Sequence, residues 1–294
     1  MSVAEHLSRM GGVATRSALV EATSRTEVQQ AISAGAIVGV ARGRYALPDA
    51  DAALVSAVRL CGVVSHTSAA LQHGWSIGAA PVRPHVTVAK NRLLTEEQKA
   101  GVELHRTNLG PDDVAGLVTS RERTLLDCLR GPSVADGLAV ADSALRDGFG
   151  PSRLRALARD ARGPGSRQVR WIAERADGRA ANGFESSLRA IALTVPGLRV
   201  VPQMSIREPA FLGRPDLVDE ALGIIVEADS FEWHGGRAAL ARDARRYNQF
   251  VVHGWLVLRF AREDVMFRPH EVRAVLMAAV AERTERRCGC GRSA

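Results

Sequence analysis

The sequence is short of aromatic residues and almost free of lysine. Phenylalanine, tryptophan and tyrosine make up 4% of its 294 residues, too few for the repeated aromatic platforms on which proteins stack single-stranded nucleic acid. Lys90 and Lys99 are the only lysines, so arginine carries nearly all of the positive charge. The formal net charge of +7 suits a polyanionic partner, although a GC-rich codon usage explains the arginine bias better than selection for phosphate binding.

Cysteine is equally scarce, and long apolar runs are missing. Four cysteines in a chain of this length form no disulfide framework, and the pair Cys288 and Cys290 lacks the second pair that a zinc site requires. We therefore expect reduced cysteines and a frayed tail over residues 288–294. No apolar run reaches about 18 residues, so no membrane span is expected. The first residues lack the features of a secretory signal, so the chain is expected in the cytoplasm.

The composition is that of a folded chain with more than one domain. Hydrophobic residues make up 46% and charged residues 24%, and 294 residues suffice for two or three domains of about 100–150 residues. A glycine- and proline-rich stretch over residues 161–166 is the best candidate boundary. It separates an α/β unit over 49–160 from a C-terminal domain over 167–287. No metal is assigned to four histidines of the middle unit, whose spacing matches no ligand pattern: His66, His73, His85 and His105.

Residues 1–48 have the parts of a winged helix-turn-helix. Three short helical patterns are marked by capping residues, with Thr15 before the second helix and Ser24 before the third. Two short strands then flank a basic tip. In such a fold the third helix and the wing face DNA, so we expect DNA contacts from Arg25, Gln29, Gln30, Arg42 and Arg44. The alternative is a winged helix that contacts protein, with these side chains solvated.

Acidic residues gather around two short apolar runs near residue 220. A four-residue turn between the runs forms a hairpin in which Asp216 stands opposite Glu227. Asp229 lies two residues further along and shares their face. Like charges this close are destabilising unless a cation neutralises them, and oxygen ligands suit a hard ion. The pattern therefore predicts a site for Mg²⁺ or Mn²⁺.

The hairpin register is the step on which this site depends. The predicted pairs are Asp219 with Ile224, Val218 with Ile225, and Leu217 with Val226. A slip of one residue would separate the acids onto two faces and leave them solvated. The apolar run around Glu227 argues for the site, because such strands are covered on both faces.

The surrounding elements resemble the PD-(D/E)xK nuclease superfamily. A helix near residue 184, a strand over 199–206, the hairpin, a helix over about 237–253 and a strand over 255–260 give the order α-β-β-β-α-β, with a parallel crossover at its end. The closer likeness is to the very-short-patch-repair-like endonuclease domain of bacterial proteins. It is carried by FESSLR at 184–189, Gln203, RPD at 214–216, VEADSFEWH at 226–234, RDARRYN at 242–248 and GWLVLRF at 254–260.

The front of the chain carries a second, weaker likeness. The winged-helix stretch and residues 118–127 are similar to the AbiEi-type antitoxin and regulator modules of bacteria. The expected fold class is therefore α/β, with an N-terminal winged helix, a middle α/β unit, and a C-terminal restriction-endonuclease-like α-β-β-β-α-β core.

The nuclease resemblance implies roles for the acidic side chains. Asp216 and Glu227 take the places of metal ligands. Asp229 stands where many members of the superfamily have lysine, which leaves the charge-stabilising group unidentified. Glu185 matches the helix acid of the family, although its spacing from Asn182 is equally that of a capping box.

Two further side chains join the expected site. His234 matches a family histidine that assists the water or the leaving group. Arg259 shares a face with Trp255 and Val257, from which it reaches a phosphate or pairs with a site acid.

The activity that follows is a metal-dependent endonuclease acting on double-stranded DNA. The acids hold Mg²⁺ or Mn²⁺, and the front module binds the duplex. The alternative is an antitoxin-like or transcriptional regulator with an inactive nuclease-fold domain. The missing lysine favours that alternative, and the retained acids argue against it. A nuclease directed at RNA also stays open, because no motif reads a 2′-hydroxyl.

Overall fold

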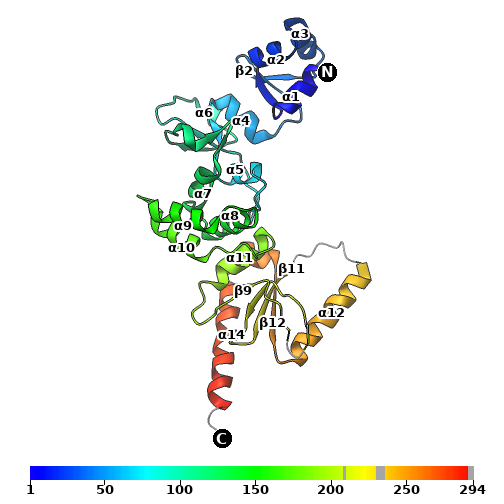
Figure 1. Cartoon of the computed structure of the whole chain (residues 1–294), viewed down its shortest axis with the longest axis vertical. Helices are drawn as coiled ribbons and strands as arrows, with labels where there is room; N and C mark the ends of the chain where they lie inside the picture. The colour runs from blue at the N-terminus through cyan, green and yellow to red at the C-terminus, as the bar shows by residue number, and fades with distance from the viewer. Residues whose placement is uncertain (208–209, 230–235, 291–294) are drawn as a thin grey trace. The chain divides into compact units, whose positions relative to one another are not determined.

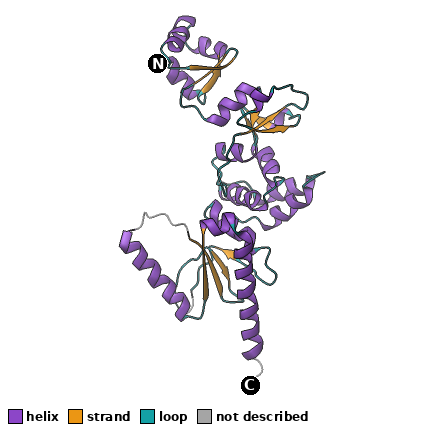
Figure 2. Cartoon of the chain, turned by 180° about the vertical axis from the view of Figure 1, so that it is seen from behind, coloured by secondary structure: helices purple, strands orange, loops and turns teal. Residues whose placement is uncertain are grey.

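The structure is a computed structural model that describes residues 1–207, 210–229 and 236–290 (Figure 1). Over these residues the chain is a mixed α/β protein with three small sheets (Figure 2). Its contacts divide it into two compact units. One comprises residues 1–74 and 80–128, and the other comprises residues 75–79 and the chain from 129 onward.

The first unit begins with three short helices whose N-termini are capped by hydroxyl groups. The side chains of Ser2, Thr15 and Ser24 accept hydrogen bonds from amides of the following turn, as the sequence predicts for the last two. The helices pack on a three-stranded sheet of order β1-β3-β2, whose first strand the pattern did not predict. The elements are α1 (Val3–Arg9), β1 (Val13–Thr15), α2 (Arg16–Ala22), α3 (Arg25–Ser33), β2 (Val38–Ala41) and β3 (Arg44–Ala46).

A five-stranded sheet of order β6-β5-β4-β8-β7 completes this unit. Gly62, just before β4, lies so close to β5 that a Cβ there would stand 2.5 Å from the carbonyl oxygen of Thr87, so only glycine fits. The elements are α4 (Ala52–Leu60), β4 (Val63–Val64), α5 (His66–Gln72), β5 (His85–Val88), α6 (Glu96–Lys99), β6 (Glu103–Arg106), a 3₁₀ turn (Pro111–Asp113), β7 (Val114–Ala115), β8 (Val118–Thr119) and α7 (Arg121–Leu129).

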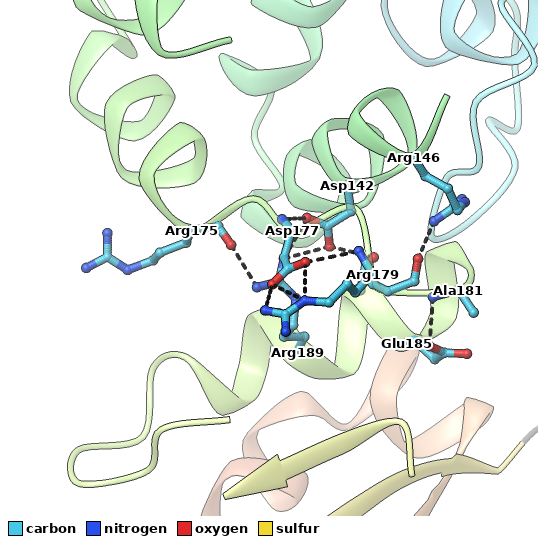
Figure 3. A network of polar contacts seen from close by, with 10 residues as sticks. Asp142, Arg146, Arg175, Asp177, Arg179, Ala181, Glu185 and Arg189 are labelled. Atoms are coloured by element: carbon cyan, nitrogen blue, oxygen red, sulfur yellow. Dashed lines mark hydrogen bonds and ion pairs between the residues drawn. The ribbon is translucent and has the colours of Figure 1, made fainter. Parts of the chain in front are cut away.

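Four helices open the second unit, and a buried ion pair joins two of them. Nη2 of Arg189 on α11 donates to both carboxylate oxygens of Asp142 on α8, at 2.6 and 2.7 Å (Figure 3). The hydroxyl of Ser186 and the amide of Asp177 also donate to Asp142. Every oxygen of this carboxylate is therefore satisfied inside the protein. The helices are α8 (Val134–Arg146), α9 (Pro151–Asp160), α10 (Ser166–Arg175) and α11 (Gly183–Ala192).

This packing differs from the boundary expected at residues 161–166. The pair of Asp142 and Arg189 ties α8 to α11, and Gln168 of α10 donates to the carbonyl oxygens of Leu129, at the end of α7, and Gly131, in the loop before α8. The two glycines of the expected boundary adopt positive φ and turn the chain from α9 into α10. The contacts therefore divide near residue 128, and the amphipathic helices α9 and α10 belong to the second unit.

The third sheet has the order β12-β11-β10-β9, with β11 and β12 parallel and the other neighbours antiparallel. The predicted succession of helix, three strands, helix and strand is confirmed, and so is the parallel pairing of the last two strands. The elements are β9 (Val201–Pro202), β10 (Leu217–Asp219), β11 (Ile224–Asp229), α12 (Gly236–Val252), β12 (Leu256–Ala261), α13 (Arg262–Phe267) and α14 (Pro269–Cys290).

The strand expected over residues 199–206 is wrong in length, because only the two residues of β9 form it. Pro202 has no amide hydrogen with which to continue the ladder. The next residue, Gln203, has a φ of 54°, in the left-handed region that side chains other than glycine seldom adopt. The amide of Gln203 donates to the carbonyl oxygen of Asp216 at 2.9 Å, so the chain bends beside the hairpin.

Helices cover both faces of the third sheet. Ile224 and Val226 of β11 pack in a core cluster with residues of α11 and α14, whereas Ile225 packs with Phe250 of α12. Figure 1 shows α12 and α14 on opposite sides of the sheet. Because side chains alternate along a strand, Glu227 lies on the α12 side.

The last helix, α14, continues through Cys290, although the sequence predicts a frayed tail from residue 288. It is 22 residues long and carries charged side chains along its length, including Glu271, Glu282 and Arg283. Across the described residues, no helix is both long and apolar enough to cross a lipid bilayer.

Candidate active site

The hairpin of β10 and β11 has the register that the sequence predicts. Leu217 pairs with Val226, Val218 with Ile225, and Asp219 with Ile224. An oxygen of Asp219 accepts the amide of Leu222 at 2.9 Å and holds the turn. The same register, continued one residue beyond β10, sets Asp216 opposite Glu227. This is the arrangement from which a carboxylate site can be built.

Asp216 is held by two donors. Its Oδ2 accepts the amide of Ala228 at 2.9 Å, and its Oδ1 accepts Nε2 of Gln203 at 3.1 Å. The same nitrogen donates to Oε2 of Glu185 at 3.0 Å. One amide therefore links the hairpin acid to the acid of α11. Gln203 is a positioning residue that the sequence pattern did not identify as part of the site.

Glu185 lies at the start of α11 as the capping alternative requires, and its role as the helix acid of a nuclease stays a prediction. Asn182 caps α11, and its side chain exchanges hydrogen bonds with the amide and the carboxylate of Glu185 at 3.0 and 2.8 Å. The amide of Ala181 donates to the same carboxylate at 2.9 Å (Figure 3). Burial, and after it the charge of Asp216, raises the pKa of Glu185. Glu185 thus stabilises the start of α11, and its pKa depends on the charge of Asp216.

Glu227 is the least compensated group of the cluster. Its side chain is nearly buried, and its Oε1 has no hydrogen-bond partner among the described residues. The nearest cation is Arg246 of α12, whose Nη2 lies 3.8 Å from that oxygen. Burial first and Asp216 second raise the pKa of Glu227 to about 8, against the opposing effect of Arg246. An unpartnered buried oxygen beside a second carboxylate fits a divalent cation.

Asp229 differs from the expectation that three acids meet at one patch. Its Oδ2 accepts Nη2 of Arg259 at 2.6 Å, so the second of the two alternatives stated for Arg259 holds in this structure. In the part of the chain that the structure describes, no three carboxylates have oxygens that all lie within 4.8 Å of one another. Asp216 and Glu227 are therefore brought together, and Asp229 is neutralised by its own cation. His234 lies outside the described residues.

Arg246 is a candidate site residue for which the sequence predicts one partner and not the other. The predicted pair with Asp243 forms at 3.6 Å, but the same guanidinium also faces Glu227. Arg246 stands four residues before Phe250, which packs on the α12 side of the sheet, so helical spacing is the signal that could have found it. The ring of Tyr247 lies under the guanidinium of Arg259, 4.2 Å from its carbon, and 5.2 Å from that of Arg246.

The residues expected to contact DNA lie in the first unit. Arg25, Gln29 and Gln30 are exposed on α3. Arg42 is exposed at the tip of the β2–β3 hairpin, and Arg44 is half-buried in β3. Exposed polar side chains suit DNA and protein partners equally, so this contact stays a prediction.

The raised pKa of Glu227 predicts a dependence of stability on pH. In the metal-free chain the folded state binds this proton up to about pH 8, whereas the ordinary value for the group is 4.5. The stabilisation that this proton gives the folded state is complete below pH 4.5 and is lost as the pH rises through about 8. The free energy of unfolding should therefore fall between these two pH values. Urea unfolding of the parent chain and of Glu227→Gln, from pH 5 to 9 with chelator, measures it. Equal slopes for the two proteins would contradict the assignment.

Comparison with known proteins finds no matching family. The chain is a distant homologue of two uncharacterized proteins of Mycobacterium tuberculosis, MT2308 of strain CDC 1551 and Rv2248 of strain H37Rv. Each is 24% identical over 267 residues, which span 85% of this chain and 95% of the relative. A crystal structure of RV2827C from the same species is similar over 70% of this chain and 87% of its own, with 16% identity and a TM-score of 0.36.

Proposed function

We propose that the third sheet and its helices form a divalent-metal-dependent endonuclease site, and that residues 1–48 form a winged helix that binds double-stranded DNA. The observation that carries the proposal is the unpartnered buried oxygen of Glu227 beside Asp216. A buried carboxylate beside a second carboxylate is unfavourable, and the guanidinium of Arg246 at 3.8 Å offsets this only in part. Mg²⁺ and Mn²⁺ suit it, because Mg²⁺ is commonly bound through one or two carboxylates together with water and substrate phosphate.

The order of elements supports the same assignment. A helix with an acid at its start, a hairpin that pairs Asp216 with the strand of Glu227, and a parallel crossover are the parts expected of a PD-(D/E)xK domain. The chain departs from that pattern at Asp229. Two arginines, Arg246 and Arg259, bring positive charge to the face where the superfamily has lysine. A cytoplasmic location is part of this proposal.

Each side chain then has a defined task. Asp216 and Glu227 would hold the ion, whose chemistry would be to lower the pKa of a water molecule and to stabilise charge on the scissile phosphate. Gln203 fixes the orientation of Asp216 through its hydrogen bond to Oδ1. Without substrate, the positive charge of Arg246 partly compensates the negative charge of Glu227. With substrate bound, Arg246 contacts a phosphate oxygen. His234 assists the proton transfer.

A regulator without nuclease activity is the second candidate, and one observation favours it. Asp229 is already paired with Arg259, and Nη2 of Arg246 lies 3.8 Å from an oxygen of Glu227, so each acid has an arginine beside it without an ion. In that case the front module would bind DNA and the third sheet would serve as a scaffold. The two candidates differ in whether a divalent ion binds the folded chain.

Metal binding should raise the unfolding temperature. An ion that binds only the folded state stabilises it by mass action, by about 2.7 kcal/mol when its concentration is 100 times the dissociation constant. We expect millimolar Mn²⁺ to shift the thermal unfolding of the parent chain upward and to leave Asp216→Asn unshifted. Differential scanning fluorimetry with Mn²⁺ or chelator measures both. Identical shifts in parent and variant would place the ion elsewhere.

The wing is tested by the salt dependence of duplex binding. The affinity for duplex falls with salt, and each neutralised phosphate adds about 0.9 to the steepness of log affinity against log salt. If Arg42 and Arg44 each neutralise one phosphate, the double variant Arg42→Ala with Arg44→Ala should make this dependence shallower by about 1.8. The full chain carrying Asp216→Asn prevents cleavage during the measurement. Arg155→Ala with Arg159→Ala removes the same charge from an exposed face of α9 and is the matched control. An unchanged slope in the wing variant removes these two arginines from the DNA-binding surface.

A further inference from the structure

Three histidines of the first unit converge, although they are far apart in the sequence. His66 begins α5, His85 begins β5, and His105 lies in β6. Nδ1 of His85 stands 2.9 Å from Nε2 of His105, and the rings of His66 and His105 are stacked with centroids 3.5 Å apart. One ring nitrogen from each lies within 4.8 Å of the other two. Among the described residues, no other set of three metal-ligating side chains meets this criterion.

The local structure holds the first of these rings in an unusual way. His66 has a φ of 51°, which only a few per cent of residues other than glycine adopt. Its Nδ1 lies 3.0 Å from the hydroxyl of Ser65, which in turn accepts the hydroxyl of Thr87 at 2.8 Å. Both hydroxyl residues are buried. Because Nδ1 of His66 contacts the hydroxyl, Nε2 is the nitrogen that is left to bind a metal ion. In many metal sites the second nitrogen of a ligating histidine likewise donates a hydrogen bond to a neighbour.

Burial of the three rings favours the neutral imidazole, which is the form that binds metal. Burial lowers the pKa of His66 to about 2 and that of His105 to about 4, with the neighbouring histidines adding to both shifts. Burial also lowers the pKa of His85. The acidic group that opposes the shifts is Glu103, which is exposed.

We propose that His66, His85 and His105 bind one divalent transition-metal ion, with Zn²⁺ as the preferred ion. Imidazole suits zinc and does not suit magnesium, so Mg²⁺ should not compete with zinc for the three histidines. Tetrahedral zinc at 2.0–2.1 Å from nitrogen sets its ligands about 3.3 Å apart, so the contact of His85 with His105 needs to open by about 0.4 Å. The stacked rings also need to rotate so that one nitrogen of each faces the same ion.

In the contact between His85 and His105, one ring nitrogen carries the proton that it donates to the other ring. On metal binding this proton moves to the other nitrogen of the same ring, so binding by three neutral imidazoles releases no proton to the solvent. Three protein ligands leave the fourth position of a tetrahedral ion for water or an anion, which is the arrangement of an open site. The proposal stands on the first unit alone and does not depend on the proposed nuclease.

Zinc titration of the chelator-treated full chain tests the site. Isothermal calorimetry should show one equivalent bound by the parent, and Co²⁺ should give the visible absorption of a tetrahedral complex. His85→Ala and His105→Ala should weaken binding more than about 100-fold, because loss of a group behind the ligands alone costs about 10–100-fold. Ser65→Ala should fall within that smaller range. Asp216→Asn and His253→Ala, an exposed histidine after α12, should bind as the parent does.

A second measurement keeps the test valid if a histidine variant does not fold. In the parent chain, Zn²⁺ should protect the three rings from acylation by diethyl pyrocarbonate, mapped by mass spectrometry, and should leave His253 reactive. Equal labelling with and without zinc overturns the proposal. So does zinc binding that disappears in Asp216→Asn and persists in the histidine variants, because the ion then occupies the carboxylates.

Discussion

Asp216→Asn and Glu227→Gln are each expected to abolish metal-dependent cleavage while leaving the fold and duplex binding intact. The amide keeps the shape of the side chain and removes the charge that holds the ion. A metal ion contributes several kcal/mol to a phosphoryl-transfer transition state, so the loss of rate should be about 10²–10⁴-fold. Gln203→Leu should lower the rate less, since Asp216 keeps its second donor, the amide of Ala228.

Single-turnover cleavage of a labelled duplex at saturating enzyme measures these effects without interference from binding. Glu220→Gln is the matched control, because Glu220 is an exposed acid in the turn of the same hairpin. It should cleave as the parent does. If Asp216→Asn cuts at the parent rate, the active site is not the carboxylate pair of Asp216, just before β10, and Glu227 on β11.

The second large effect is on stability, and it concerns the buried pair of Asp142 and Arg189. The two side chains are 0% and 3% exposed, and both oxygens of the carboxylate accept the same guanidinium nitrogen (Figure 3). Asp142→Asn leaves a buried cation without its partner, which costs about 3–5 kcal/mol. For a domain of about 150–250 residues this lowers the unfolding temperature by roughly 6–20 °C. Arg189→Met should act in the same direction, because it strands the carboxylate.

Calorimetric unfolding of the two variants beside the parent chain tests this estimate. Asp160→Asn provides the control, since Asp160 pairs with Arg159 on an exposed surface and its loss should leave the unfolding temperature unchanged. An Asp142→Asn protein that unfolds within a degree of the parent would show that α8 and α11 are held together by apolar packing alone.

The hairpin that positions the acids could be predicted because local rules determine it. A four-residue turn, which here includes Gly223 at a φ of 62°, and an apolar run covered on both faces allow one register. The parallel crossover was predictable for a similar reason, since a strand, a helix and a strand joined by short loops rarely pair otherwise. Capping residues such as Thr15 likewise fixed the starts of short helices in the first unit.

The partners of the site side chains could not be predicted, because they come from elements distant in the sequence. The left-handed backbone of Gln203 has no marker in the residue type, yet it brings one amide to two carboxylates. Arg246 faces Glu227 through the placement of α12 on β11, a contact that the sequence pattern did not predict. The pairing of Arg259 with a site acid was one of two predicted alternatives, and the structure identifies Asp229 as the partner.

The histidine cluster was missed for a related reason. Its members are 19 and 20 residues apart along the chain, and only the pairing of β4 with β5 and of β5 with β6 brings them together. Their spacing along the chain matches no ligand pattern, whereas the sheet sets the distance between them in space. The same lesson holds for the expected boundary at 161–166, where composition indicated a linker and the buried pair of α8 and α11 determines the division.

The most direct test of the proposed function is incubation of the metal-free full chain with plasmid and linear duplex DNA, in Mg²⁺, Mn²⁺ or chelator. The account predicts cleavage with either ion, none with chelator, and none by Asp216→Asn under any condition. Single-stranded and duplex RNA in parallel reactions identify the nucleic acid that is cut. A parent chain that binds duplex but cuts neither DNA nor RNA with any divalent ion would contradict the nuclease assignment and establish the regulator in its place.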